Sequence, residues 1–234
     1  FSTPFDSKSF DFCIKNNVDA IKVASFETTN NKLINKLLKF KKTIFISTGQ
    51  NKKNEIKKIY KKFEKNKNQI CLMHCISSYP TLDKDANIYR LNNLSQISKY
   101  ILGYSDHTLG RDVSIAAVAL GASVIEKHFT LDKTMNGPDH KASLNPEELR
   151  EMIVAIRNIE RAMGDGIKKP SKSEQPNLII ARKSIVASCS IKEGEVFSKD
   201  NISVKRPGIG ISPMNWDSII GSIATKNYQM DDLI

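Results

Sequence analysis

The hydrophobic residues of the first 163 positions alternate between short continuous runs and longer stretches in which apolar positions recur every three or four residues. The short runs predict strands that are buried on both faces, and the longer stretches predict amphipathic helices. The expected strands cover residues 20–25, 43–48, 70–75, 101–106 and 123–129. The expected helices cover residues 7–16, 31–40, 52–65, 91–99, 111–120 and 146–163.

Strands that alternate with helices predict an α/β fold, because helical crossovers connect parallel strands. Residues 1–2 supply the end of one further strand. A closed (β/α)8 barrel needs eight strands in roughly 250 residues. The pattern therefore indicates either an open, doubly wound sheet or a barrel that lacks its first strands. Because the chain starts without methionine and without a signal-peptide pattern, we expect an N-terminal segment to be missing.

The last expected helix carries a complete start signal. Asn145 is the expected N-cap, Pro146 occupies the first helical position, and Glu147 and Glu148 lie in the first turn. The helix is expected to end near Gly164.

Residues 164–177 are an expected linker, because they contain glycine, proline, serine and lysine without an apolar period. We therefore expect one domain over residues 1–163 and a second over residues 178–234. The second domain is expected to be rich in β-structure, with short strands and turns in residues 179–187, 191–197 and 202–205.

The net charge of +11 comes from 36 Lys and Arg residues against 25 Asp and Glu residues. Many of the lysines lie in residues 52–67, where Ile56, Ile59, Tyr60 and Phe63 recur at helical spacing. A solvated helix face explains this charge, so we expect no nucleic-acid partner. A hydrophobic fraction of 40% excludes a disordered tail, and no run of 18 apolar residues predicts a membrane span. The four cysteines lack paired metal-ligand spacing and are expected to be reduced thiols of a cytoplasmic protein.

Polar residues gather at the expected carboxyl ends of the strands, where parallel α/β sheets bind their ligands. Three of the four histidines, His74, His107 and His128, lie there, and we expect them to form a functional cluster. His107 and His128 follow consecutive strands, about 4.8 Å apart in a sheet, so both imidazoles can face one space. Such a pair leaves open positions on an octahedral Mn²⁺, Co²⁺ or Fe²⁺ ion. The alternative is a pair of buried, hydrogen-bonded histidines.

Hydroxyl groups and one ammonium group share these strand ends. The residues are Thr3, Lys22, Ser25, Ser47, Ser77 and Ser105. They suit a small, dense anion that carries phosphate and carboxylate groups. Lys22 lies within an apolar strand, so it needs an anionic partner unless the strand edge is exposed to solvent. Glu27 and Asp139 are candidates for holding a polyhydroxylated substrate, although loop carboxylates are usually only solvated.

Several stretches then resemble the N-acetylneuraminate (sialic acid) synthase family in content and order. They are FSTPFD (1–6), IKVASFE (21–27), ISTG (46–49), HC (74–75), YP (79–80), GYSDHTL (103–109), VIEKHFT (124–130), GPDHKAS (137–143) and VKRPG (204–208). The resemblance implies a TIM barrel, here without its first strands, followed by a small antifreeze-like (SAF) domain. It also implies condensation of phosphoenolpyruvate with N-acetylmannosamine, or a related N-acetylated hexose, to a nonulosonic acid and phosphate.

The resemblance further implies roles for individual residues. His107 and His128 match the metal ligands, with Mn²⁺ as the expected ion and Mg²⁺ or Co²⁺ as alternatives. Lys22 and Glu27 match catalytic positions, and Glu27, Tyr79 and Asp139 match sugar contacts. Arg206 matches an arginine that reaches the sugar in the partner subunit, which implies a domain-swapped homodimer. The phosphoenolpyruvate contacts are matched by Thr3, Lys22, Ser25, Ser47, Ser77 and Ser105.

Two departures from the family pattern affect what we expect. Phe26 stands where many members carry glycine, and Ser77 stands where some carry asparagine. The family's first two strands, which carry a glutamate and a second phosphate-binding lysine, have no counterpart in this sequence. We therefore expect residues 1–234 alone to be inactive.

Other functions remain open at this point. A legionaminic or pseudaminic acid synthase would use the same chemistry, and a metal-dependent barrel hydrolase would use a similar site. An inactive fragment or a basic binding module is the alternative from another class.

Overall fold

The computed structural model describes residues 1–234 and places five parallel strands next to one another in chain order. They are β1 (Ala20–Val23), β2 (Thr43–Ser47), β3 (Ile70–Cys75), β4 (Leu102–Asp106) and β5 (Ala122–Lys127). Ser2 adds a parallel bridge to Ile21 beside β1. This sequential order is typical of a barrel wall, whereas a doubly wound sheet reverses direction at a switch point. The order therefore argues against the doubly wound alternative.

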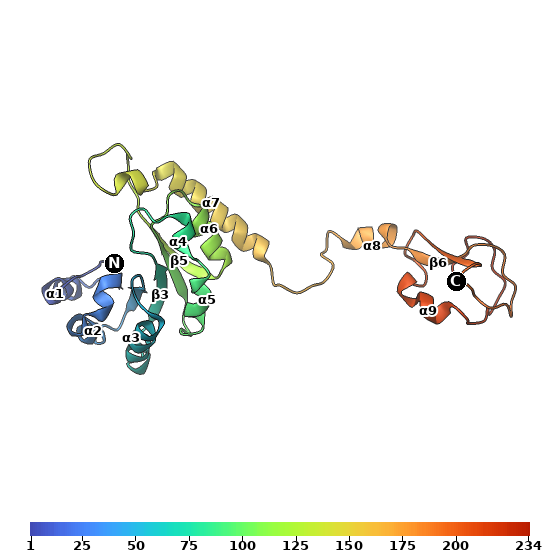
Figure 1. Cartoon of the computed structure of the whole chain (residues 1–234), viewed down its shortest axis with the longest axis horizontal. Helices are drawn as coiled ribbons and strands as arrows, with labels where there is room; N and C mark the ends of the chain where they lie inside the picture. Colours follow the sequence, from blue (N-terminus) through green and yellow to red (C-terminus); the bar gives the residue numbers. More distant parts are fainter. The chain divides into compact units, whose positions relative to one another are not determined.

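Helices connect the strands and are arranged around the sheet (Figure 1). They are α1 (Ser7–Lys15), α2 (Asn31–Leu37), α3 (Lys53–Lys65), α4 (Asp83–Ala86), α5 (Arg90–Ser95), α6 (Asp112–Ala119) and α7 (Pro146–Met163). Short 3₁₀ helices lie at Ser25–Thr29 and His140–Ala142. All six predicted helices are present, although α2 and α5 end earlier than expected. The chain leaves α2 early enough for Phe40 to pack into the core from a loop.

The amphipathic pattern of α3 is confirmed. Ile56, Ile59, Tyr60 and Phe63 are buried in the main core of the first unit, and the lysines of the same helix are exposed. The basic stretch is thus the solvent side of a packed helix.

The start signal of α7 is also confirmed. The side chain of Asn145 accepts the Glu148 N–H at 2.9 Å, and the Glu148 carboxylate accepts the Asn145 N–H at 2.9 Å. This reciprocal cap satisfies two backbone donors that the first helical turn leaves free.

The chain divides into two units, Phe1–Asp165 and Gly166–Ile234. The second unit contains α8 (Gln175–Ala181), the antiparallel pair β6 (Ser184–Ala187) and β7 (Ile202–Lys205), a 3₁₀ helix (Pro213–Asn215) and α9 (Trp216–Ile219). It has its own hydrophobic core, which includes Ile185, Ile191 and Phe197.

The interpretation of residues 175–181 as linker and strand is wrong, because they form α8. Pro176 lies in the first turn of this helix, and the β-branched Ile179 and Ile180 that suggested a strand are exposed rather than buried. Residues 191–197 form a turn that is flanked by single antiparallel bridges, from Ile191 to Tyr228 and from Val196 to Ile223. No helix in the structure combines the length and hydrophobicity needed to cross a bilayer, and all four cysteines are free thiols.

Candidate active site

The side chains of His107 and His128 face each other at the carboxyl ends of β4 and β5. Their ring centroids lie 5.3 Å apart, with an interplanar angle of 82°. The Tyr79 ring closes the group, with its centroid 4.1 Å from that of His107 and 5.6 Å from that of His128. The predicted pairing of these two imidazoles is therefore present in the structure.

His107 has a defined tautomer, and both imidazoles are favoured in the neutral form. Nδ1 of His107 lies 2.7 Å from the Ile76 carbonyl oxygen, and a carbonyl only accepts, so Nδ1 carries the proton and Nε2 offers a lone pair. Burial lowers the pKa of His107 below its ordinary value, and burial together with the charge of His107 lowers the pKa of His128. The neutral form that a metal requires is therefore favoured at neutral pH.

No group of three or more His, Cys, Asp or Glu side chains is arranged to hold a metal. Asp139 is the carboxylate beside the pair, with Oδ2 3.7 Å from Nδ1 of His128. A divalent ion at this place would therefore take two imidazoles from the protein and fill its other positions with water or substrate oxygens.

Lys22 forms an ion pair with Glu126, which is the anionic partner that a lysine within an apolar strand needs. Ser105 donates to the same Glu126 oxygen at 2.9 Å. Glu126 is two residues before His128 and therefore shares its strand face, so this charged group lies on the same side of the sheet as the imidazole pair. Glu126 was not among the site residues expected from the sequence.

Three serines surround the turn after β2. A Cβ placed on Gly49 would lie 2.5 Å from Oγ of Ser77 and 2.8 Å from Oγ of Ser25, so both hydroxyls converge on this glycine. The Ser25 hydroxyl accepts the Gly49 N–H at 3.0 Å. Ser47 is 1% exposed, and its hydroxyl is the one buried side-chain polar atom without a partner. A buried, unsatisfied hydroxyl costs about 1–3 kcal/mol, so it marks a position that a ligand can satisfy.

Three other predicted site residues, Thr3, Glu27 and Arg206, are not part of these clusters. Thr3 follows the Ser2 bridge to β1, and the Glu27 carboxylate accepts from Asn30 Nδ2 at 2.7 Å with no contact to the imidazoles. Arg206 belongs to the second unit, where its Nε donates to the Ala181 carbonyl at 3.1 Å.

His74 is not part of the cluster, and the expectation that it would be is wrong. Its ring is 2% exposed, stacks on Tyr104 at 5.5 Å and lies with Nε2 2.7 Å from the Ala86 carbonyl. His74 is therefore a satisfied packing residue on the other face of β3.

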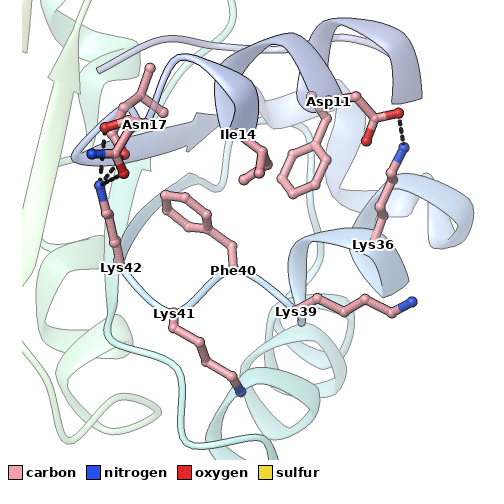
Figure 2. Close-up of a pocket in the computed structure, with 10 residues that line it drawn as sticks. Asp11, Ile14, Asn17, Lys36, Lys39, Phe40, Lys41 and Lys42 are labelled. Carbon is pink, nitrogen blue, oxygen red and sulfur yellow. Dashed lines mark hydrogen bonds and ion pairs between the residues drawn. The ribbon is translucent and has the colours of Figure 1, made fainter.

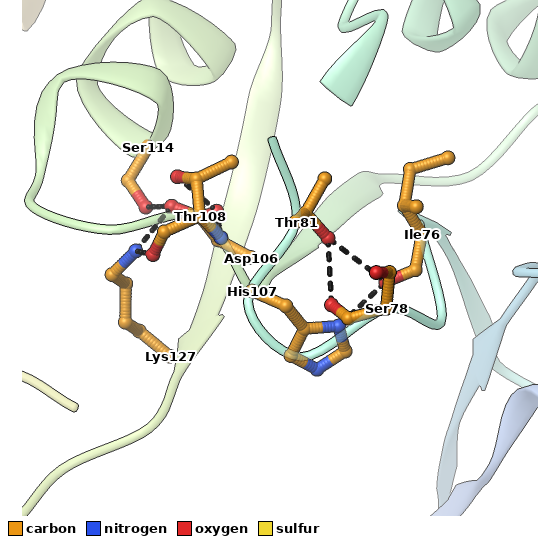
Figure 3. Close-up of polar contacts among 8 residues, drawn as sticks. All are labelled: Ile76, Ser78, Thr81, Asp106, His107, Thr108, Ser114 and Lys127. Carbon is orange, nitrogen blue, oxygen red and sulfur yellow. Dashed lines mark hydrogen bonds and ion pairs between the residues drawn. The ribbon is translucent and has the colours of Figure 1, made fainter. Parts of the chain in front are cut away.

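A buried ion pair that sequence reasoning missed fixes the turn at His107 (Figure 3). Asp106 Oδ2 accepts from Lys127 Nζ at 2.8 Å and from Ser114 Oγ at 2.5 Å. Asp106 Oδ1 accepts from the Thr108 N–H at 2.8 Å and from the Thr108 hydroxyl at 2.7 Å. His107 lies between two residues that this network holds.

The same turn is tied to the loop that carries Ser77 and Tyr79. The Thr81 N–H donates to the His107 carbonyl at 2.8 Å, and the Thr81 hydroxyl donates to the Ser78 carbonyl at 2.8 Å (Figure 3). The orientation of His107 thus depends on its neighbours on both sides. A signal was available in the sequence, since Asp106 and Lys127 place opposite charges on adjacent strands.

Comparison with known proteins gives matches over both units. Residues 1–168 match the NeuB family and residues 182–234 match the SAF domain. An N,N'-diacetyllegionaminic acid synthase of Campylobacter jejuni is 49% identical over an alignment of 236 residues that covers 100% of this chain and 71% of that protein. The human N-acetylneuraminate-9-phosphate synthase is 34% identical over 232 residues, 98% of this chain and 64% of that protein.

A solved structure extends the similarity to the fold. A putative spore coat polysaccharide biosynthesis protein E of Chromobacterium violaceum has a TM-score of 0.82 and 27% identity, and the match covers 99% of this chain and 70% of that one. The chain thus spans about two thirds of the length of these proteins.

Proposed function

Because the chain belongs to the NeuB family, we propose that it condenses phosphoenolpyruvate with an N-acetylated hexose to give a nonulosonic acid and phosphate. The observation that carries this proposal is the imidazole pair beside the Lys22–Glu126 ion pair at the carboxyl ends of the strands. We also propose that the five strands belong to an eight-stranded barrel, since their order is that of a barrel wall. The reaction is expected in the cytoplasm, where phosphoenolpyruvate is available.

The choice of sugar follows the relatives rather than the first expectation from the sequence. N-acetylneuraminic acid was the expected product, but the relative at 49% identity is named for N,N'-diacetyllegionaminic acid and the N-acetylneuraminate relative is only 34% identical. Phosphoenolpyruvate contributes three carbons and no nitrogen, so both acetamido groups of such a product come from the hexose. We therefore favour a hexose that carries two acetamido groups, which corresponds to the legionaminic acid alternative.

Each group of site residues is assigned one part of the reaction. Lys22 and the hydroxyls of Ser25, Ser47 and Ser77 hold the phosphate and carboxylate of phosphoenolpyruvate, so that its methylene carbon lies near the sugar aldehyde. A carbon–carbon bond forms between those two atoms, water adds at C2 and phosphate leaves. The imidazoles of His107 and His128 hold a divalent cation, for which we favour Mn²⁺; when bound, it polarises the aldehyde oxygen.

Tyr79 and Asp139 adjoin the imidazoles, which supports the sugar contacts assigned to them. Ser105 keeps its expected phosphoenolpyruvate contact, and its hydroxyl also donates to Glu126, the partner of Lys22. Thr3 and Glu27 keep the phosphoenolpyruvate and sugar roles that the family resemblance implies.

A phosphate-release assay tests the proposed reaction and its sugar. The chain, with any residues that its gene encodes ahead of Phe1, is incubated with phosphoenolpyruvate, Mn²⁺ and either N-acetylmannosamine or a diacetamido hexose. A site that hydrogen-bonds the second acetamido group is expected to favour the diacetamido sugar by at least about 100-fold in kcat/KM. Equal turnover of the two sugars would contradict the sugar assignment. If neither sugar led to phosphate release, the proposed synthase reaction would be contradicted.

Arg206 tests the proposed homodimer, in which this arginine reaches the sugar in the partner subunit. Arg206→Ala is expected to raise the KM of the sugar at least about tenfold, because a charged hydrogen bond is lost. The KM of phosphoenolpyruvate is expected to stay within about twofold. A matched control is Arg182→Ala, on an exposed arginine of the same unit. Equal changes in both KM values would count against the swapped arrangement.

A further inference from the structure

A second cavity lies at the opposite end of the sheet from the imidazole pair. It has a volume of about 470 Å³ and lies between α1 and the end of α2. Val18 and Lys42, which line it, precede β1 and β2 at the amino ends of the strands. The cavity shares no residue with the candidate active site.

The floor of this cavity is apolar. Phe10, Ile14, Val18 and Phe40 line it, and the Phe10 and Phe40 rings meet edge to face with centroids 6.4 Å apart. Both phenylalanines are buried in the core, so the floor is fixed, whereas Ile14 is 43% exposed and open to a ligand. Such a floor suits the apolar face of a small molecule.

The rim of the cavity is strongly basic. Lys36 is held by Asp11 at 2.6 Å, and Lys42 is held by the side chain of Asn17 at 2.8 Å (Figure 2). Asp11 is the only acidic residue that lines the cavity, against four lysines. The ammonium groups of the other two, Lys39 and Lys41, make no hydrogen bond or ion pair and remain available to an anion.

We propose that this cavity binds a small amphipathic anion. Its flat or acyl body lies against Ile14, Phe10 and Phe40, and its phosphate or carboxylate group pairs with Lys39 or Lys41, whose side chains extend in different directions (Figure 2). The volume falls within the roughly 300–1,000 Å³ that is typical of small-molecule sites. Nucleoside phosphates and acyl carboxylates share this chemistry.

A fluorescence titration of the whole chain with 8-anilinonaphthalene-1-sulfonate tests the site, because this dye combines a flat apolar body with one anionic group. Lys39→Glu/Lys41→Glu is expected to weaken dye binding at least about tenfold, because the lysine that pairs with the sulfonate is lost and the new carboxylates repel it. Ile14→Asp is expected to do the same by placing a carboxylate in the floor. The matched controls are Lys58→Glu/Lys65→Glu on the exposed face of α3 and Ile153→Asp on α7, where Ile153 is 46% exposed.

Each outcome of the dye titration either supports or overturns the proposal. Dye binding that is lost in the cavity variants, kept in the controls and displaced by ATP or by octanoate supports the proposal, and the effective competitor identifies the ligand class. Unchanged binding in the cavity variants, loss in the controls or displacement by neither competitor would overturn it. Melting curves confirm that each variant is folded, and none of these residues belongs to the proposed synthase site.

Discussion

Replacement of His107 or His128 by alanine is expected to reduce metal-dependent phosphate release by at least about 10³-fold, because polarisation of the aldehyde is worth several kcal/mol. Either change leaves one imidazole for the cation, so Mn²⁺ binding is expected to fall as well. The two readouts are the phosphate-release assay and a Mn²⁺ titration followed by electron paramagnetic resonance.

His140→Ala is the matched control for these variants. His140 lies in the neighbouring loop and contacts Thr130 through Nδ1 at 2.7 Å, outside the imidazole pair. Its replacement is expected to leave Mn²⁺ binding unchanged. Wild-type turnover or unchanged Mn²⁺ affinity in either His107→Ala or His128→Ala would refute the assignment of the metal ligands.

The second large effect concerns the ion pair of Asp106 and Lys127, whose side chains are 0% and 3% exposed. Lys127→Met leaves the Asp106 carboxylate buried without its cation, and Asp106→Asn leaves the Lys127 ammonium buried without its anion. Each single change is expected to cost about 3–5 kcal/mol of unfolding free energy. The double change, Asp106→Asn/Lys127→Met, is expected to recover most of that loss, because neither charge remains buried.

Urea denaturation followed by circular dichroism measures this effect, since most helices belong to the first unit. The single tryptophan, Trp216, lies in the second unit, so its fluorescence transition is an internal control that is expected not to move. A single variant that loses less than about 1 kcal/mol, or a double variant that loses the sum of both, would contradict the account of this pair.

Hydrophobic periodicity predicted the elements that depend on local sequence. The strands are near-continuous apolar runs, and the α7 cap uses a signal that extends over only four residues, 145–148. Periodicity failed at α8, because Ile179 and Ile180 favour a strand by intrinsic propensity while Pro176 favours a helix start.

The imidazole pair was predictable because His107 and His128 end consecutive strands with neighbouring positions in the sheet. His74 occupies a similar place, but period-two alternation does not say which face of a strand points toward the site. The structure turns His74 toward Ala86, on the helix side. The ion pair of Asp106 and Lys127 was missed for the same reason. These two residues alternate with the site residues along β4 and β5, so they face the opposite side of the sheet. They meet there because the two strands are paired.

One site is expected to hold both a divalent cation and phosphoenolpyruvate. A crystal structure of the protein with Mn²⁺ and phosphoenolpyruvate, with anomalous diffraction to locate the manganese, tests it most directly. The account predicts a manganese peak within bonding distance of His107 and His128, and a phosphate or carboxylate oxygen that accepts from Lys22 and Ser47. Manganese at any other place, or phosphoenolpyruvate away from those two side chains, would contradict it.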